Sequence, residues 1–167
     1  MQFFVNIYSV IVSPSKTFER FASEFNKDLL FQGIFVFLLA TMIDSELSLA
    51  KTLDSIVNLI LLAALVFLFG YVFKLKAKDF LKILGLSCFA SVPIIFSAPI
   101  RLLGDVPFGI GMWLGFVLAI WIFSLNVIAI SKACQIQKRK VLLFATIPII
   151  LFVTILVGSV LEIFFLF

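Results

Sequence analysis

Long apolar runs dominate this sequence and limit what it can fold into. Five segments approach the length of about 20 helical residues that crosses roughly 30 Å of hydrocarbon; they are residues 28–49, 53–73, 80–103, 109–131 and 141–167. Hydrophobic residues make up 63% of the 167 residues, against about 45–50% in an ordinary soluble domain. A chain of this length cannot hide so much apolar area from water. We therefore expect an integral membrane protein.

The expected spans are α-helices. Within lipid, each backbone polar group must find a partner inside the protein, which leaves only helices and closed barrels. A barrel strand alternates lipid-facing and lumen-facing residues, and these runs show no such alternation. The predicted fold class is therefore all-α: a polytopic bundle of five transmembrane helices over residues 28–167, preceded by an N-terminal amphipathic interfacial segment over residues 1–27.

The first span is the weakest of the five. Its apolar core is short, and Asp44 and Glu46 lie near its outer end. A re-entrant first segment is the alternative, and it would place the later basic loops on the opposite side from the basic N-terminus.

The third span contains Pro93 and Pro99, and the fifth contains Pro148. Because proline removes an intrahelical hydrogen bond, we expect the third span to be bent or broken.

The distribution of basic residues orients the bundle. With the N-terminus in the cytoplasm and five spans, only Lys51 and Arg101 fall outside. The other eleven of the 13 Lys and Arg residues lie inside: Lys16, Arg20, Lys27, Lys74, Lys76, Lys78, Lys82, Lys132, Lys138, Arg139 and Lys140. The positive-inside rule predicts this asymmetry. The C-terminus is then expected outside.

The first 27 residues predict two amphipathic helices. The first carries an apolar stripe of Phe3, Phe4, Ile7, Tyr8 and Ile11. Ser13 is a candidate cap for the second helix, with Pro14 in its first turn, and the second stripe consists of Phe18, Phe21 and Phe25. Such helices lie in the cytoplasmic interface, either as a surface sensor or partner platform, or as an anchor that packs on the bundle.

Three segments together carry a resemblance. They are SPSKTF before the first span, KLKAKDFLKILGLSCFASVP leading into the third, and IWIFSLNVIAISKACQIQKRKVLLFATIP joining the fourth to the fifth. With five spans, they resemble the Yip (Ypt-interacting protein) membrane domain family in its small prokaryotic form, over nearly the whole chain. The resemblance implies a five-span fold and a cytoplasmic N-terminus. Eukaryotic relatives act in vesicle traffic through Rab-type GTPases with a long cytosolic N-terminal region, which this sequence lacks, so Rab binding is not carried over.

Polar residues inside the expected bilayer are the candidates for function, because such residues are costly there. The set that could line a polar pathway is Asn58, Asn126, Gln32 and Glu162; the alternative for the amides is hydrogen bonding between helices. Asp44, Glu46 and Asp54 form a possible outer acidic cluster for a cation or proton. The alternative for these carboxylates is an ordinary hydrated loop.

Two further patterns concern packing and lipid. Gly111 and Gly115 form a GxxxG pair, which lets helix backbones approach within the bundle or across a dimer seam. Two basic clusters are candidate contacts for anionic lipid headgroups; they are Lys74, Lys76 and Lys78, and Lys138, Arg139 and Lys140.

Enzymatic motifs are missing from the sequence. It has no GxxxxGK, HExxH, GxSxG or dinucleotide fingerprint and no histidine, so we expect no enzyme, metal or cofactor. The basic residues of the cytoplasmic loops account for the net charge of +4, so nucleic-acid binding is not expected.

The expected function is to organise or assist membranes or membrane proteins in a prokaryotic cytoplasmic membrane, with lipids, other membrane proteins or a second copy as partners. The alternative is a small transporter, channel or lipid-moving protein with a pathway beside the kinked third helix.

Overall fold

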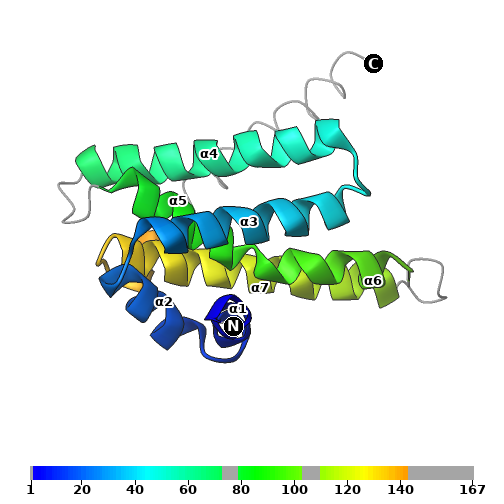
Figure 1. Cartoon of the computed structure of the whole chain (residues 1–167), viewed down its shortest axis with the longest axis horizontal. Helices are drawn as coiled ribbons and strands as arrows, with labels where there is room; N and C mark the ends of the chain where they lie inside the picture. Colours follow the sequence, from blue (N-terminus) through cyan, green and yellow to red (C-terminus); the bar gives the residue numbers. More distant parts are fainter. Residues whose placement is uncertain (1, 73–78, 103–109, 143–167) are drawn as a thin grey trace, which may run out of the picture. The chain divides into compact units, whose positions relative to one another are not determined.

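The computed structural model describes residues 2–72, 79–102 and 110–142 of the chain. The chain divides into two compact units, residues 1–135 and residues 136–167, and the helices below belong to the first. These described residues form helices and turns without a strand (Figure 1), which confirms the predicted all-α class. The helices are α1 (Gln2–Val12), α2 (Pro14–Ser23), α3 (Lys27–Asp44), α4 (Leu49–Val72), α5 (Phe80–Ala90), the 3-10 helix η1 (Val92–Phe96), α6 (Ser97–Leu102) and α7 (Ile110–Ala133).

Side-chain caps fix where two of these helices begin. The Asn26 side chain accepts a hydrogen bond from the backbone N–H of Leu29 at the start of α3, and Asp79 accepts one from Lys82 at the start of α5. Each bond satisfies a backbone donor that has no partner within its helix. Ser13 occupies the cap position before α2, with Pro14 as the first helical residue, but its side chain makes no capping bond.

The third predicted span is interrupted at the place where Pro93 lies. Helix α5 ends at Ala90, the chain continues as the 3-10 helix η1 with Pro93 in its first turn, and α6 follows from Ser97. Pro99 lies in the first turn of α6, where the missing backbone N–H costs little. The polypeptide from Phe80 to Arg101 nevertheless forms one long apolar element.

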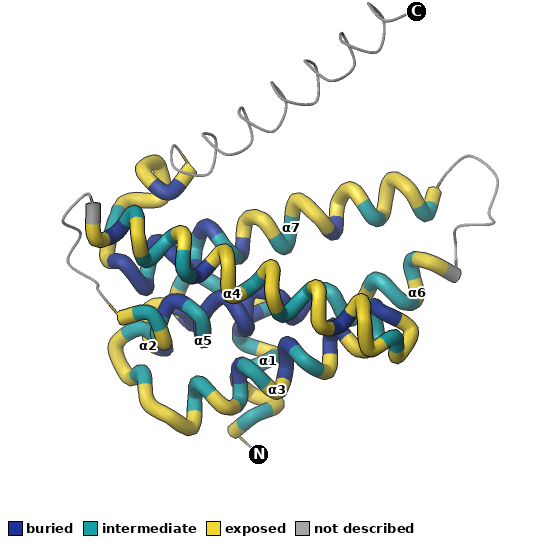
Figure 2. The backbone as a smooth tube through the Cα atoms, turned by 90° about the horizontal axis from the view of Figure 1, so that it is seen from above, coloured by how far each residue is buried: buried dark blue, intermediate teal, exposed yellow. Residues whose placement is uncertain are grey.

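Helix α5 is the centre of the first unit, and it packs against α3, α4 and α7. Of the residues in the apolar window of the α5–α6 element, 56% are buried inside the protein, against 17% for α4 (Figure 2). Outward-facing residues of α4 and α7 are instead large and apolar, including Leu61, Leu68, Trp113 and Phe116. The protein therefore presents hydrocarbon side chains on its outside as well as in its core.

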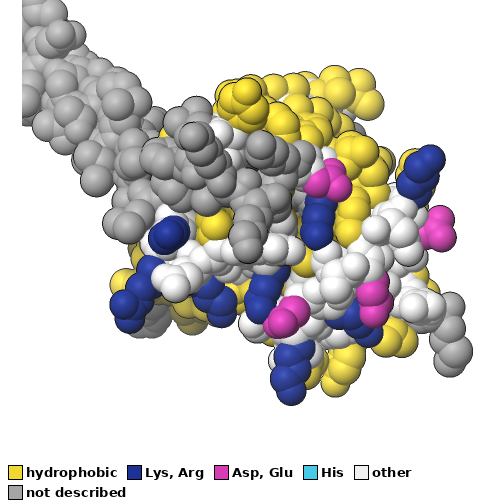
Figure 3. Space-filling view, turned by 90° about the vertical axis from the view of Figure 1, so that its left-hand side faces the viewer, with side chains coloured by type: hydrophobic (Ala, Val, Ile, Leu, Met, Phe, Trp, Pro, Cys, Tyr) yellow, Lys and Arg dark blue, Asp and Glu magenta, His cyan; other side chains and the backbone are white. Residues whose placement is uncertain are grey.

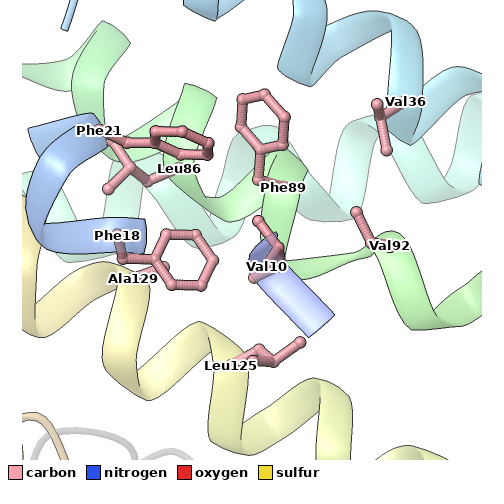
Figure 4. Close-up of a cluster of buried hydrophobic side chains, with 10 residues drawn as sticks. Val10, Phe18, Phe21, Val36, Leu86, Phe89, Val92, Leu125 and Ala129 are labelled. Atoms are coloured by element: carbon pink, nitrogen blue, oxygen red, sulfur yellow. The ribbon is translucent and has the colours of Figure 1, made fainter. Parts of the chain in front are cut away.

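The N-terminal helices contribute to the core. Phe18 and Phe21 of α2 and Val10 of α1 are buried with Leu86 and Phe89 of α5, and Figure 4 shows these side chains pointing toward one another. The rings of Phe21 and Phe89 are 4.8 Å apart between centroids. Helix α2 thus packs on the bundle through its apolar stripe.

Helix α1 divides its apolar residues between two environments. Phe3, Ile7 and Ile11 pack against the core, whereas Phe4 and Tyr8 are 74% and 67% exposed. The stripe of five residues predicted for this helix is therefore split, with part of it turned away from the bundle.

Three helical elements are long and apolar enough to cross a membrane, judged by length and composition among the described residues: Leu49–Tyr71, Phe80–Arg101 and Ile110–Ala133. They correspond to the second, third and fourth predicted spans. Helix α3, the first predicted span, has 18 residues with charges at both ends and is not among them. The fifth predicted span, with Pro148 and Glu162, lies almost wholly outside the described residues. The count of five spans stays a prediction.

Candidate functional site

A buried amide joins three helices at one end of the bundle. Asn6 of α1 is only 4% exposed. Its Nδ2 donates to Oε1 of Gln32 on α3 over 3.0 Å, and its Oδ1 accepts from a guanidinium nitrogen of Arg20 on α2, also over 3.0 Å. Both polar ends of the Asn6 side chain are therefore satisfied, as a buried amide requires. The chain of hydrogen bonds from Arg20 through Asn6 to Gln32 links α2 to α3 by way of α1.

This chain of bonds forms one wall of a polar cavity of about 190 Å³, which we call the α2–α3 pocket. Its lining contains one cation and two carboxylates, Arg20, Glu24 and Asp28. Arg20 also lies 5.3 Å from the centroid of the Phe21 ring, so its guanidinium is held from two sides. Among the described residues, no salt bridge joins Arg20 to either carboxylate.

An apolar hollow of about 300 Å³ adjoins this pocket. Gln32 lines both cavities, and the other lining residues of the hollow are Phe3, Phe31 and Phe35. The Phe3 and Phe35 rings meet edge to face with centroids 5.7 Å apart. Phe31 and Phe35 are 67% and 54% exposed, so the hollow is open to the outside of the protein.

The residues predicted for a polar pathway do not all lie together. Asn58 and Asn126 line one hollow of about 270 Å³ between α3, α4, η1 and α7, near the break at Pro93. Gln32 belongs instead to the α2–α3 pocket, and Glu162 lies outside the described residues. The Nδ2 group of Asn126 donates to the carbonyl of Ile122 over 3.0 Å, whereas its buried Oδ1 has no hydrogen-bond partner among the residues that the structure describes.

The predicted outer acidic residues fall into two groups. Asp44 and Glu46 each lie 3.7 Å from the guanidinium of Arg101. Asp54 accepts a hydrogen bond from Asn58, 3.2 Å away, on the same face of α4. The structure thus pairs the first two carboxylates with a cation and the third with an amide.

Arg101 has a second role at the same place, which the sequence did not indicate. Its guanidinium donates to the backbone carbonyls of Asp44 and, over 3.0 Å, of Ile43. These carbonyls end α3, where a cation is favourable because the helix dipole is negative there. The sequence singled out Arg101 only as one of the two basic residues expected outside the cytoplasm.

At the opposite end of the bundle, Lys132 of α7 joins α2. Its ammonium lies 2.6 Å from a carboxylate oxygen of Glu19. The hydrogen bond from Lys132, together with its positive charge, lowers the pKa of Glu19 below the usual 4.5. Figure 3 views this end and shows Lys and Arg side chains beside Asp and Glu side chains.

The remaining candidates are less well defined. Lys74, Lys76 and Lys78 lie outside the described residues, and Lys138, Arg139 and Lys140 are exposed in the second unit. A Cβ atom added at Gly115 would meet no atom within 4 Å, so the described residues provide no close neighbour for that part of the GxxxG pair. Its role in packing remains a prediction, as does that of Gly111.

Sequence reasoning missed most of the α2–α3 pocket. It identified Gln32, but not Asn6, Arg20 or Glu24 as partners in a site. One signal was available: Asn6 stands among the apolar residues of α1, and such a residue needs a polar partner when its helix packs against others.

Comparison with known proteins gives one positive result. A family model described as Yip1 domain matches residues 8–159 of the chain. No curated protein and no solved structure matches this chain. The match covers most of the chain and confirms the family to which the three sequence segments pointed.

Proposed function

Because the chain belongs to the Yip1 domain family, we propose that this membrane protein organises or assists membranes or other membrane proteins. It does so by binding and packing, without catalysing a reaction. The observation that carries the proposal is the apolar outer surface of the helices. Trp113 and Phe116 on α7 and Leu61 on α4 are all largely exposed in the isolated chain. Hydrophobic surface of this extent needs lipid or a membrane-protein partner to cover it.

The topology belongs to this proposal. We place the chain across the membrane five times, with α3 as the first span, the N-terminus in the cytoplasm and the C-terminus outside. Two structural relationships support this arrangement. Glu19 of α2 pairs with Lys132 at the end of α7, so both belong to the basic side, and Arg101 pairs with Asp44 and Glu46 at the other end. A prokaryotic cytoplasmic membrane suits the short connections.

The competing function is transport of an ion, a metabolite or a lipid. It rests on the hollow that Asn58 and Asn126 share beside the break in the third span. A discontinuous helix next to polar side chains is a common setting for transporter sites. A gap in helix packing that is lined by two amides would have the same geometry, so a measurement of transport must distinguish the two.

Photo-crosslinking in native membranes tests the proposal. A photoreactive residue at Trp113 or Phe116 should crosslink to lipid or to a neighbouring membrane protein, because these side chains face outward. The same residue at Leu86 serves as the control, since that side chain is fully buried and should crosslink only within the chain. Crosslinks from Leu86 equal to those from Trp113 would contradict the assigned surface.

A flux measurement in liposomes tests the competing function. The proposal expects no movement of ions, small metabolites or fluorescent lipid above protein-free liposomes. Flux that Asn58→Leu or Asn126→Leu abolishes, and that Ser124→Leu leaves intact, would replace the proposal with transport. Ser124 is a matched control because it is exposed on the same helix as Asn126 and, within the described part of the chain, its hydroxyl donates to the carbonyl of Ile120 alone.

A further inference from the structure

The α2–α3 pocket and the apolar hollow together have the form of a site for a single amphiphile. One is polar and charged, the other is lined by three phenylalanines, and they meet at Gln32. We propose that they bind one membrane phospholipid with an ethanolamine headgroup: the phosphate at Arg20, the ammonium at Glu24 and Asp28, and an acyl chain against Phe31 and Phe35. This inference rests on the proposed membrane placement of α3.

The charges in the pocket match a headgroup of this type. Arg20 and Glu24 are four residues apart at the end of α2, so their side chains project from the same side of the chain. Guanidinium is the preferred partner of phosphate, and an ammonium with three N–H groups is a natural donor to carboxylates. An ethanolamine phosphate holds the two opposite charges a few bonds apart.

The same charges discriminate between headgroups. With one cation and two carboxylates, the charged lining carries a net charge of −1. A headgroup with a phosphate and no ammonium would contact Arg20. It would leave the carboxylates of Glu24 and Asp28 without a cationic partner and would add the negative charge of the phosphate beside them. A choline headgroup has a cation, but its quaternary nitrogen has no N–H to donate to the carboxylates. The ethanolamine headgroup is the one that satisfies all three side chains.

The guanidinium of Arg20 is positioned in advance. It is bonded to Asn6 and lies beside the Phe21 ring, and Asn6 is in turn held by Gln32. A side chain that is already ordered loses less conformational entropy when a ligand binds. The buried amide therefore acts as a positioning residue for the phosphate contact.

The direction of the hollow fits a lipid tail. Asp28 lies in the first turn of α3, and Phe35 lies about 10 Å further along the helix axis at 1.5 Å per residue. With the start of α3 at the membrane surface, the pocket and the hollow together run from headgroup depth into the hydrocarbon. Phe31 and Phe35, which are exposed in the isolated chain, would then be covered by the acyl chain.

Titration of the full-length protein in detergent micelles with dioctanoyl lipids tests this site, with bound lipid counted by native mass spectrometry. We expect dioctanoyl phosphatidylethanolamine to bind roughly tenfold more tightly than dioctanoyl phosphatidylglycerol or phosphatidylcholine. O-phosphoethanolamine, which has the headgroup without acyl chains, should bind far more weakly. Equal affinity for the three lipids, or equal binding of O-phosphoethanolamine, would overturn the proposal.

Three variants assign the effect to the pocket. Arg20→Gln should weaken binding of phosphatidylethanolamine by about tenfold, because the phosphate loses a charged donor. Glu24→Gln should reduce the preference for phosphatidylethanolamine over phosphatidylglycerol. Lys16→Gln is the matched control, a basic residue on the same helix that does not line the pocket, and it should change neither value.

The Glu24→Gln variant and the labelling of topology distinguish a failure of lipid recognition from a failure of folding or of topology. Glu24 is exposed and makes no salt bridge among the described residues, so Glu24→Gln tests the site even if Arg20→Gln lowers the melting temperature. If neither variant changes the lipid preference, the site is wrong. That result would leave the proposed topology standing, because topology is measured independently by labelling.

Discussion

Helices α3 and α5 meet at Gly33 and Gly85. A Cβ atom on Gly33 would lie 2.8 Å from the carbonyl oxygen of Gly85, and one on Gly85 would lie 2.9 Å from the ring of Phe25. No real Cβ atom occupies the first position without a shift of backbone, so glycine at residue 33 allows the two helices to cross at this distance. Small residues at crossing points are the usual way in which membrane helices approach closely.

Gly33→Ala should therefore destabilise the protein. The added methyl group meets backbone and the Phe89 ring, and overpacking of this kind costs about 1–3 kcal/mol in the free energy of unfolding. Thermal melting in detergent micelles measures the loss. Gly115→Ala is the control, because a Cβ there meets nothing within 4 Å, and its melting temperature should not fall. Equal melting temperatures for both variants would contradict the crossing.

Phe21→Ala should be among the most damaging single substitutions in the N-terminal segment. The side chain is 2% exposed and packs on Phe89, and removing a buried phenylalanine ring typically costs about 3–5 kcal/mol. Phe4→Ala, at an exposed position of α1, should leave the melting temperature in micelles almost unchanged. If both variants melt alike, α2 is a loosely attached surface helix and not part of the core.

Arg101→Gln should loosen the end of α3. The variant loses two ion pairs with exposed carboxylates and weakens the bonds to the carbonyls of Ile43 and Asp44. Since surface ion pairs contribute little, we expect a cost of about 1 kcal/mol. Lys51→Gln, another exposed basic residue near the same turn, is the comparison and should cost less. Faster amide hydrogen exchange at residues 41–47 in the Arg101 variant alone would locate the effect.

The contact between Glu19 and Lys132 gives stability that depends on pH. The pKa of Glu19 is lowered in the folded protein, so its contribution is fully present above the usual pKa of 4.5 and is lost as the pH falls through the lower folded value. The difference in melting temperature between the native chain and Glu19→Gln should therefore be largest near neutral pH and disappear in acid. A difference that persists unchanged at pH 3 would show that the ion pair is not its cause.

Much of the fold follows from the sequence. Hydrophobic run length predicted α4, the α5–α6 element and α7 within a few residues, and the position of Pro93 predicted the interruption of the third. These features are local, because they depend on the length of a run or the geometry of one residue.

The candidate site was less predictable because it depends on distant residues. Asn6 is hydrogen-bonded to Arg20 and to Gln32 across three helices, and no spacing rule relates these positions. The acidic residues show the same difficulty: Asp44 and Asp54 are close in sequence, but Arg101, 57 residues beyond Asp44, determines which of them is neutralised. Helix crossing at Gly33 was missed for this reason as well, since its partner Gly85 lies on another element.

Membrane-impermeant maleimide labelling in intact cells, on variants that each carry one introduced cysteine, tests the central claim most directly. The native Cys88 and Cys134 are buried, and burial raises the pKa of the Cys134 thiol to about 11, so both should give little background. We predict that Lys51→Cys is labelled from outside, whereas Lys16→Cys, Lys76→Cys and Arg139→Cys are labelled only after the membrane is permeabilised. Labelling of Lys76→Cys and Arg139→Cys from different sides would contradict the five-span topology.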